Sequence, residues 1–450
     1  MRLFLPPLQI GDEDGFTPEK DLFGRKVIGD GLTNLVISID QPLVLALDAQ
    51  WGSGKTTFLK MWAGELRKSG VGVVFFDAFE SDYLDDAFTS IAGQIISLAR
   101  EKKVDGDGKL KNFTNKAFAA GKVLARSALK LGVKAGTAGI MTAEDLHGVA
   151  SDVSSEMSGL TDKYLGERLT RQKEQEEAIV EFRQALAELP ALLGDSGDET
   201  GAIKPLVIII DELDRCRPSF ALEVLERIKH FFSVENVHFV LGVHLGQLEN
   251  SVNFAYGSNV DSRTYLQKFI SFTVNLVDHS SHESDSAIAR YIRYIESQLQ
   301  LPADMRDMID KQVARIARNN NLSFRTIEKI YTNIAAALAF SPPNSFRPGV
   351  IVAGLCVLKV THPNLYMRAR DGRVTYDELA GPLSLEKKYN EEEYGIERAI
   401  DFWRYVTNHP MTDEEVQPYR NILMQNRIRS RDDLLPRICK RIVDPLMLPK

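Results

Sequence analysis

A segment that combines glycine, serine and lysine follows directly after an apolar run near the N-terminus. The apolar run is Leu43–Leu47, and residues 49–57 read Ala-Gln-Trp-Gly-Ser-Gly-Lys-Thr-Thr. Glycines allow a tight loop whose backbone N–H groups point inward and can surround an anion. A helix that starts directly after such a loop adds the positive end of its dipole. The segment therefore predicts a buried strand, a phosphate-binding loop and a helix, in that order.

The polar residues of this loop have predicted roles at a nucleoside triphosphate. Lys55 is expected to reach the β- and γ-phosphates, and the Thr56 hydroxyl is expected to bind Mg²⁺. The usual pattern begins with glycine, and Ala49 stands in that place. The alternative is an ordinary Gly-Ser turn, but the strand–loop–helix order favours phosphate binding. The expected nucleotide-binding residues of the loop are Trp51, Gly52, Ser53, Gly54, Lys55, Thr56 and Thr57.

A second apolar run, Pro205–Ile210, ends in two acidic residues. Asp211 is a candidate Mg²⁺ ligand, because hard cations prefer carboxylate oxygen. Glu212 is a candidate general base that polarises the attacking water. Acids at strand ends are common, so the pair indicates a nucleotide site only because a phosphate loop precedes it in the same α/β pattern. Together the two motifs predict hydrolysis of a nucleoside triphosphate, with ATP as the expected nucleotide and Mg²⁺ as the cofactor.

Three further residues follow the ends of the predicted core strands. Arg215 is a candidate catalytic residue that stabilises transition-state charge, in its own subunit or in a neighbouring one. The alternative for Arg215 is a structural ion pair with Asp214 or Asp211. Arg217 is a candidate for the same catalytic role, but a structural ion pair is favoured for it. His244 stands where a polar sensor of the γ-phosphate commonly sits, although a histidine at a strand end is often only hydrogen-bonded.

Strands and helices alternate over the first part of the chain. Continuous apolar strands predict a parallel sheet that is buried on both faces, and the alternation predicts a doubly wound α/β fold. The expected strands are Pro42–Asp48, Val71–Phe76, Pro205–Ile210, Val237–Val243 and Ile270–Val277. The expected helices of this part are Asp21–Ile39, Thr56–Leu66, Tyr83–Arg100, Lys163–Leu189 and Pro218–Phe232.

The pattern of elements also predicts how the chain is divided. Residues 1–280 are expected to form the core, with a helical insertion at about 101–165. Residues 281–340 are expected to form a helical domain and residues 341–450 a C-terminal helical region. The predicted fold is thus an α/β P-loop NTPase core with a parallel sheet, a helical insertion and helical C-terminal parts.

Composition limits the classes of protein that fit this chain. Of its 450 residues, 44% are hydrophobic and 26% are charged, which is the range of soluble globular proteins. The net charge of −7 argues against wholesale coating of nucleic acid. The three cysteines lie far apart, which fits a reducing cytoplasm. We find no apolar stretch of signal-peptide or membrane-spanning character in the sequence, so the expected location is cytoplasmic.

A row of basic residues recurs every four positions within the Ala- and Gly-rich stretch Phe113–Met141. Its members are Lys122, Arg126, Lys130 and Lys134. On a helix they form one stripe, which could meet an anionic membrane surface or the phosphates of a nucleic acid. The alternative is a solvated face of a helix packed on its own domain, and this interpretation is slightly favoured.

With these motifs in place, the chain resembles the KAP family of P-loop NTPases over most of residues 20–335. The most specific likenesses are the phosphate loop, which carries a tryptophan in the family as at Trp51, and the acidic motif Asp211–Cys216. The shorter likenesses are Asp21–Arg25, Phe76–Phe79, Tyr265–Ile270 and Ser323–Arg325.

The resemblance implies a phosphate-loop strand near the centre of a parallel sheet, followed by a helical domain. It also implies a sensor role for Arg325 and a place in phage exclusion or antiviral defence. Many members hold transmembrane helices in the insertion, but the closely spaced charges here predict at most peripheral contact with a membrane.

Three functions fit these observations. The first is Mg²⁺-dependent ATP hydrolysis coupled to a conformational or regulatory output through a partner protein or self-association of the helical regions. The second is a nucleotide-gated interaction module with negligible hydrolysis. The third is a membrane- or DNA-associated scaffold that uses the basic stripe. The presence of Glu212 favours the first.

Overall fold

The computed structural model describes most of the chain and places it in two compact units. The described residues are 2–6, 8–83, 86–102, 108–122, 173–174, 176–194, 203–276, 286–341, 346–386, 394–426, 428 and 430–444. Contacts between residues assign Ile10–Ala49 and Lys55–Leu276 to one unit, and Met1–Gln9, Gln50–Gly54 and Val277–Lys450 to the other. Three members of the basic stripe, Arg126, Lys130 and Lys134, and most of the expected insertion lie outside the described residues.

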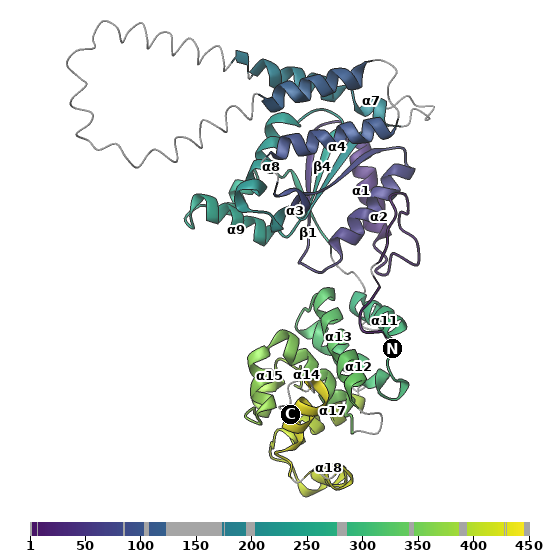
Figure 1. Ribbon diagram of the computed structural model, residues 1–450, viewed down its shortest axis with the longest axis vertical. Coiled ribbons are helices and arrows are strands. Elements are labelled where there is room, and N and C mark those ends of the chain that lie inside the picture. The colour runs from purple at the N-terminus through teal and green to yellow at the C-terminus, as the bar shows by residue number, and fades with distance from the viewer. Residues whose placement is uncertain are drawn as a thin grey trace, which may run out of the picture. The chain divides into compact units, whose positions relative to one another are not determined.

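The first unit is built on a parallel sheet of five strands (Figure 1). Its strands lie in the order β2-β3-β4-β1-β5, and every neighbouring pair is parallel. The bounds are β1 Leu43–Asp48, β2 Gly72–Asp77, β3 Leu206–Asp211, β4 Val237–Val243 and β5 Phe272–Asn275. The predicted α/β class and parallel sheet are therefore confirmed, and the strand before the phosphate loop is hydrogen-bonded on both sides.

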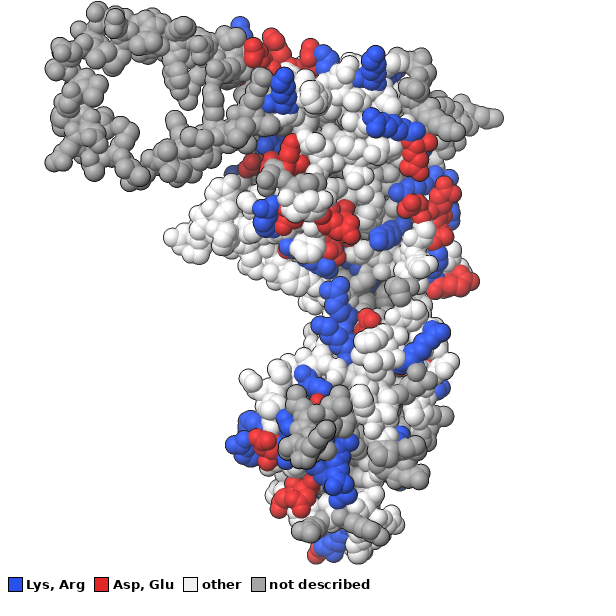
Figure 2. Space-filling model, viewed as in Figure 1, with Lys and Arg blue, Asp and Glu red and all other residues white. Residues whose placement is uncertain are grey.

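Strands β1 to β4 are largely apolar and buried because helices cover both faces of the sheet, whereas the edge strand β5 is mostly exposed. Successive residues of a strand point to opposite faces. Val207 and Ile209 accordingly belong to one hydrophobic cluster, whereas Ile208 and Ile210 belong to another. Figure 1 shows α1 and α2 on one side of the sheet and α4 and α8 on the other. Side chains of both charge signs are interspersed over the face that Figure 2 shows, as expected of a solvated surface.

The described helices of this unit are α1 Lys26–Ser38, α2 Lys55–Lys68, α3 Ala78–Ser81, α4 Ala87–Glu101, α7 Pro190–Leu193, α8 Pro218–Phe231, α9 Leu245–Tyr256 and α10 Ser262–Leu266. Further helical residues lie at 109–122 and 176–187.

Hydrogen bonds to aspartate side chains set the starts of two core helices. The expected first helix begins at Lys26 rather than Asp21, because the Asp21 carboxylate accepts the N–H groups of Arg25 and Lys26 at 2.8 and 2.9 Å. Helix α4 likewise begins after Asp86, whose carboxylate caps it.

The second unit is helical and has its own hydrophobic core. Its helices are α11 Ala287–Leu299, α12 Ala303–Asn319, α13 Phe324–Phe340, α14 Gly349–Thr361, α15 Pro363–Arg370, α16 Tyr376–Ala380, α17 Tyr394–Val406, α18 Asp413–Gln425 and α19 Leu434–Ile438, followed by a π-helical turn at Cys439–Val443. One cluster of buried residues extends from Ile292 to Val443 and includes the fully buried Tyr331 and Trp403. The boundaries expected near residues 280 and 340 stay a prediction.

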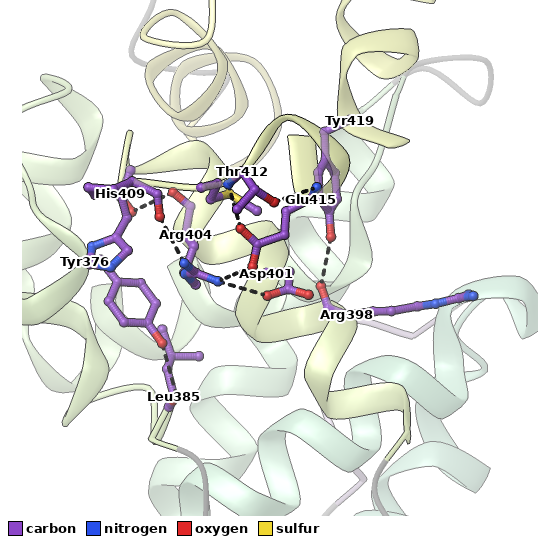
Figure 3. A network of polar contacts seen from close by, with 12 residues as sticks. Tyr376, Leu385, Arg398, Asp401, Arg404, His409, Thr412, Glu415 and Tyr419 are labelled. Carbon is purple, nitrogen blue, oxygen red and sulfur yellow. Dashed lines mark hydrogen bonds and ion pairs between the residues drawn. The ribbon is translucent and has the colours of Figure 1, made fainter. Parts of the chain in front are cut away.

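A polar network joins α17 to α18 within this unit (Figure 3). The Arg404 guanidinium lies 3.0 Å from Oε1 of Glu415 and 3.5 Å from Oδ1 of Asp401, and it donates to the Pro410 carbonyl at 2.9 Å. Glu415 also closes a capping box with Thr412 at the start of α18. One arginine thus fixes the turn between the two helices. Among the helices that the structure describes, none is both long and apolar enough to cross a membrane.

Candidate nucleotide site

The carboxyl ends of the parallel strands meet at one edge of the sheet and place acidic residues there. In the strand register Asp77 lies opposite Asp211, and Asp211 lies opposite Gly242. Asp48 ends the strand on the other side of β4, opposite Val243. Such an edge is where open α/β sheets bind ligands. Asp48 and Asp77 were not singled out from the sequence, although each ends an apolar strand, which is the signal that marked Asp211.

The phosphate loop uses glycine where its backbone requires it and alanine where it does not. Gly52 and Gly54 have φ angles of 77° and 82°, a region that residues with a Cβ rarely adopt. Ala49 instead continues β1, because its N–H donates to the Val243 carbonyl at 3.1 Å and it has no positive φ. Alanine in the first position of the motif is therefore compatible with this backbone.

Lys55 is a buried cation at the first position of α2. Only 8% of its surface is exposed, and its Nζ donates to the Ala49 carbonyl at 3.1 Å. Burial lowers the pKa of Lys55, and the carboxylates of Asp214, Asp211 and Asp48 oppose that shift. Acidic residues of the sheet edge are thus near enough to the ammonium group to favour its charged form, and its role in phosphate binding stays a prediction.

Asp211 is fully buried at the end of β3. Its Oδ1 accepts the Glu212 N–H at 2.9 Å, and its Oδ2 is buried without a hydrogen-bond partner among the described residues. Burial raises the pKa of Asp211, whereas hydrogen bonds from Thr56 and from the Glu212 backbone lower it. The structure therefore brings together Thr56 and Asp211, the two expected Mg²⁺ ligands. Their hydroxyl and carboxylate oxygens are donors that Mg²⁺ accepts, so the residues present fit the ion.

Glu212 has a left-handed backbone conformation, with φ of 59° and ψ of 23°. Its carboxylate Oε1 lies 2.7 Å from Nη1 of Arg215. Burial raises the pKa of Glu212, and the Arg215 guanidinium opposes the shift. Arg215 thus pairs with the candidate base, a partner that the sequence did not indicate. Arg217 forms a structural ion pair, with its Nε 3.0 Å from Oδ1 of Asp82.

Two expected site residues lie at helix N-termini. His244 precedes α9 directly after β4, and the N–H of the next residue, Leu245, donates to Oδ1 of Asp48 at 2.9 Å. Arg325 lies in the first turn of α13 in the helical unit, after the capping residue Ser323. The sensor roles of His244 and Arg325 stay predictions.

Gly242 leaves the space that the Asp211 side chain occupies. A Cβ at Gly242 would lie 2.5 Å from Oδ1 of Asp211 and 2.5 Å from Cδ1 of Leu59. Gly242→Ala is therefore expected to lower the free energy of unfolding by about 1–3 kcal/mol, as overpacking does, and to displace the carboxylate. Chemical denaturation checks the effect, with Gly93→Ala as the control.

Gly93 is the matched control because a Cβ there meets nothing within 4 Å and the residue lies within α4. Gly93→Ala is expected to leave stability unchanged or to raise it by about 0.5–1 kcal/mol. Equal stability of Gly242→Ala and the wild type would contradict the close packing at Asp211.

A comparison with protein families agrees with the motifs of this site. The sequence matches the KAP family P-loop domain over residues 26–338, which is more than half of the chain. The chain therefore belongs to the KAP family of P-loop NTPases, a class of nucleotide-binding proteins, as its motifs indicated. A search of curated proteins finds no match.

Solved structures with a remote likeness include two proteins in complex with nucleotides or nucleotide analogues. One is the Aeropyrum pernix ORC2 protein in ADPNP and ADP complexes, with 12% identity, a TM-score of 0.34, and coverage of 92% of this chain and 88% of that chain. The other is the replication initiator DnaA bound to AMPPCP and single-stranded DNA, with 10% identity, a TM-score of 0.28, and coverage of 93% and 99%.

Proposed function

We propose that this protein binds ATP with Mg²⁺ and hydrolyses it. The observation that carries the proposal is that buried Lys55, at the end of the phosphate loop, and buried Asp211, at the end of β3, lie close enough to act on each other's charge, with Glu212 directly after Asp211. Lys55 neutralises charge on the β- and γ-phosphates, and the N–H groups of the loop and the start of α2 surround them. The remaining loop residues Trp51, Gly52, Ser53, Gly54 and Thr57 complete the nucleotide site in this proposal.

Hydrolysis proceeds by attack of water on the γ-phosphorus. Glu212 accepts a proton from the water as its oxygen bonds to phosphorus. The bond from phosphorus to the β–γ bridging oxygen breaks, and its electron pair leaves with ADP. Thr56 and Asp211 would hold Mg²⁺. The bound ion would neutralise charge on the phosphates. Arg215 supports this step through its ion pair with Glu212, and His244 and Arg325 sense the γ-phosphate.

The output of hydrolysis in this proposal is a conformational or regulatory change of the helical unit. In nucleotide-dependent switches, segments that contact the γ-phosphate are commonly ordered while it is bound and released after hydrolysis. The receiving partner is a protein or a second copy of this chain, in the cytoplasm and in the context of antiviral defence. A nucleotide-gated module with negligible hydrolysis is the second candidate, because the carboxylate of Glu212 is paired with Arg215.

Replacing Asp211 tests the metal assignment. Asp211→Asn keeps the shape of the side chain and removes its charge, so hydrolysis should require a higher Mg²⁺ concentration, by about tenfold or more. The measurement is a Mg²⁺ titration of ATP hydrolysis at fixed nucleotide. Asp82→Asn, at a carboxylate that pairs with Arg217, is the control and should keep the wild-type Mg²⁺ midpoint. Identical midpoints for Asp211→Asn and the wild type would refute the assignment.

A further inference from the structure

The turn after β3 contains an ion pair next to the candidate metal ligand. Nη1 of Arg215 lies 2.7 Å from Oε1 of Glu212, and the two side chains are 28% and 16% exposed. A charge pair that is mostly shielded from water is held more strongly than one on an open surface. The Arg215 guanidinium also lies close enough to Lys55 to act on its charge, so the pair belongs to the nucleotide site.

The local backbone explains why these two side chains meet. Residues Leu213–Arg215 form a 3₁₀ turn, and Glu212 stands directly before it. Such a turn is closed by backbone hydrogen bonds between residues three positions apart. The Arg215 N–H donates to the Glu212 carbonyl at 3.0 Å, so a backbone hydrogen bond joins the same two residues. The spacing of Glu212 and Arg215 is therefore set by the turn.

The turn is fixed at both of its ends. The Glu212 N–H donates to Oδ1 of Asp211 at 2.9 Å, and Leu213 is fully buried. Beyond the turn, the Arg217 N–H donates to the Asp82 carboxylate at 3.0 Å. Glu212 keeps its left-handed conformation although it carries a Cβ, which makes that conformation unfavourable. Strain that is held in this way by its surroundings is typical of functional positions.

We propose that Arg215 is a positioning residue, which holds the Glu212 carboxylate in the orientation needed to accept a proton from the attacking water. The inference rests on the proposed function. A carboxylate has lone pairs on two oxygens, so contact at Oε1 orients the group while a lone pair remains for the proton. Arg215 in this view acts through Glu212 rather than by direct contact with the phosphates.

A double-mutant cycle separates the two modes of action. Arg215→Gln is expected to lower the single-turnover rate of ATP hydrolysis by about 10- to 100-fold, as misplacement of a catalytic group does, with little change in KM. In a Glu212→Gln background the same change should lower the rate less than about twofold, because no base is left to orient. Arg215→Lys should restore part of the rate, since it keeps the charge.

The matched control is Arg217→Gln in the same loop, which breaks the pair with Asp82 and should change the rate similarly in both backgrounds. Melting temperature and affinity for a fluorescent ATP analogue verify the fold of each variant. An equal effect of Arg215→Gln in both backgrounds would overturn the proposal and show direct action on the phosphates. A wild-type rate for Arg215→Gln would overturn it as well. If Glu212→Gln alone hydrolyses ATP at the wild-type rate, the proposed function has failed and the positioning role fails with it.

Discussion

Lys55→Ala should abolish the rise in melting temperature that Mg²⁺-ATP gives the wild-type protein. Lys55 is the buried cation at the start of α2, and its pKa is lowered by burial within the site. A ligand at ~100 times its dissociation constant stabilises a folded protein by about 2.7 kcal/mol. Loss of the charge opposite the β- and γ-phosphates should remove most of that stabilisation. The measurement is thermal unfolding with and without the nucleotide.

A second lysine of the same helix provides the control. Lys60 is exposed on α2, where its Nζ lies 5.9 Å from the centre of the Phe75 ring. Lys60→Ala should keep the nucleotide-dependent rise, so that a general effect on the helix is separated from phosphate binding. An undiminished rise in Lys55→Ala would show that the phosphate loop does not bind ATP through this side chain.

Glu212→Gln should bind ATP with wild-type affinity and hydrolyse it at least ~100-fold more slowly. The amide keeps the size of the side chain and its contact distance to Arg215, but it cannot take a proton from water at neutral pH. A 100-fold loss corresponds to about 2.7 kcal/mol of activation free energy. Steady-state release of phosphate and equilibrium binding of a fluorescent ATP analogue measure the two effects separately.

A glutamate outside the site provides the control for this variant. Glu80→Gln alters a carboxylate in α3 that lies outside the proposed machinery, and it should hydrolyse ATP at the wild-type rate. Reduced affinity of Glu212→Gln, together with an unchanged rate per bound nucleotide, would place Glu212 in nucleotide binding and leave the base unassigned.

The sheet could be predicted because its signals are local. Strands buried on both faces need continuous apolar runs, and such runs are visible at Leu43–Leu47 and Pro205–Ile210. The phosphate loop was also readable, because positive φ angles at Gly52 and Gly54 require glycine. The start of α1 could not be predicted, because the Asp21 carboxylate accepts the N–H groups of Arg25 and Lys26 where the periodicity suggested a helical turn.

The arrangement within the site depended on conformations that residue types do not reveal. The partner of Arg215 follows from a 3₁₀ turn and a left-handed glutamate, and glutamate has no preference for that backbone. The placement of Asp48 and Asp77 at the same sheet edge as Asp211 depends on strand register, because the register determines which strand ends lie side by side. The core of the helical unit unites residues from Ile292 to Val443, contacts that no short window of sequence contains.

Single-turnover hydrolysis tests the central claim most directly, because it isolates the chemical step from release of product. Excess protein is mixed with radiolabelled ATP and Mg²⁺, and conversion to ADP is followed for the wild type and for Glu212→Gln. The wild type is expected to convert the bound ATP, and Glu212→Gln is expected to bind the same amount and convert it at least ~100-fold more slowly. Equal rates for the two proteins, or no conversion by the wild type, would contradict the assignment of this protein as an ATPase with Glu212 as its base.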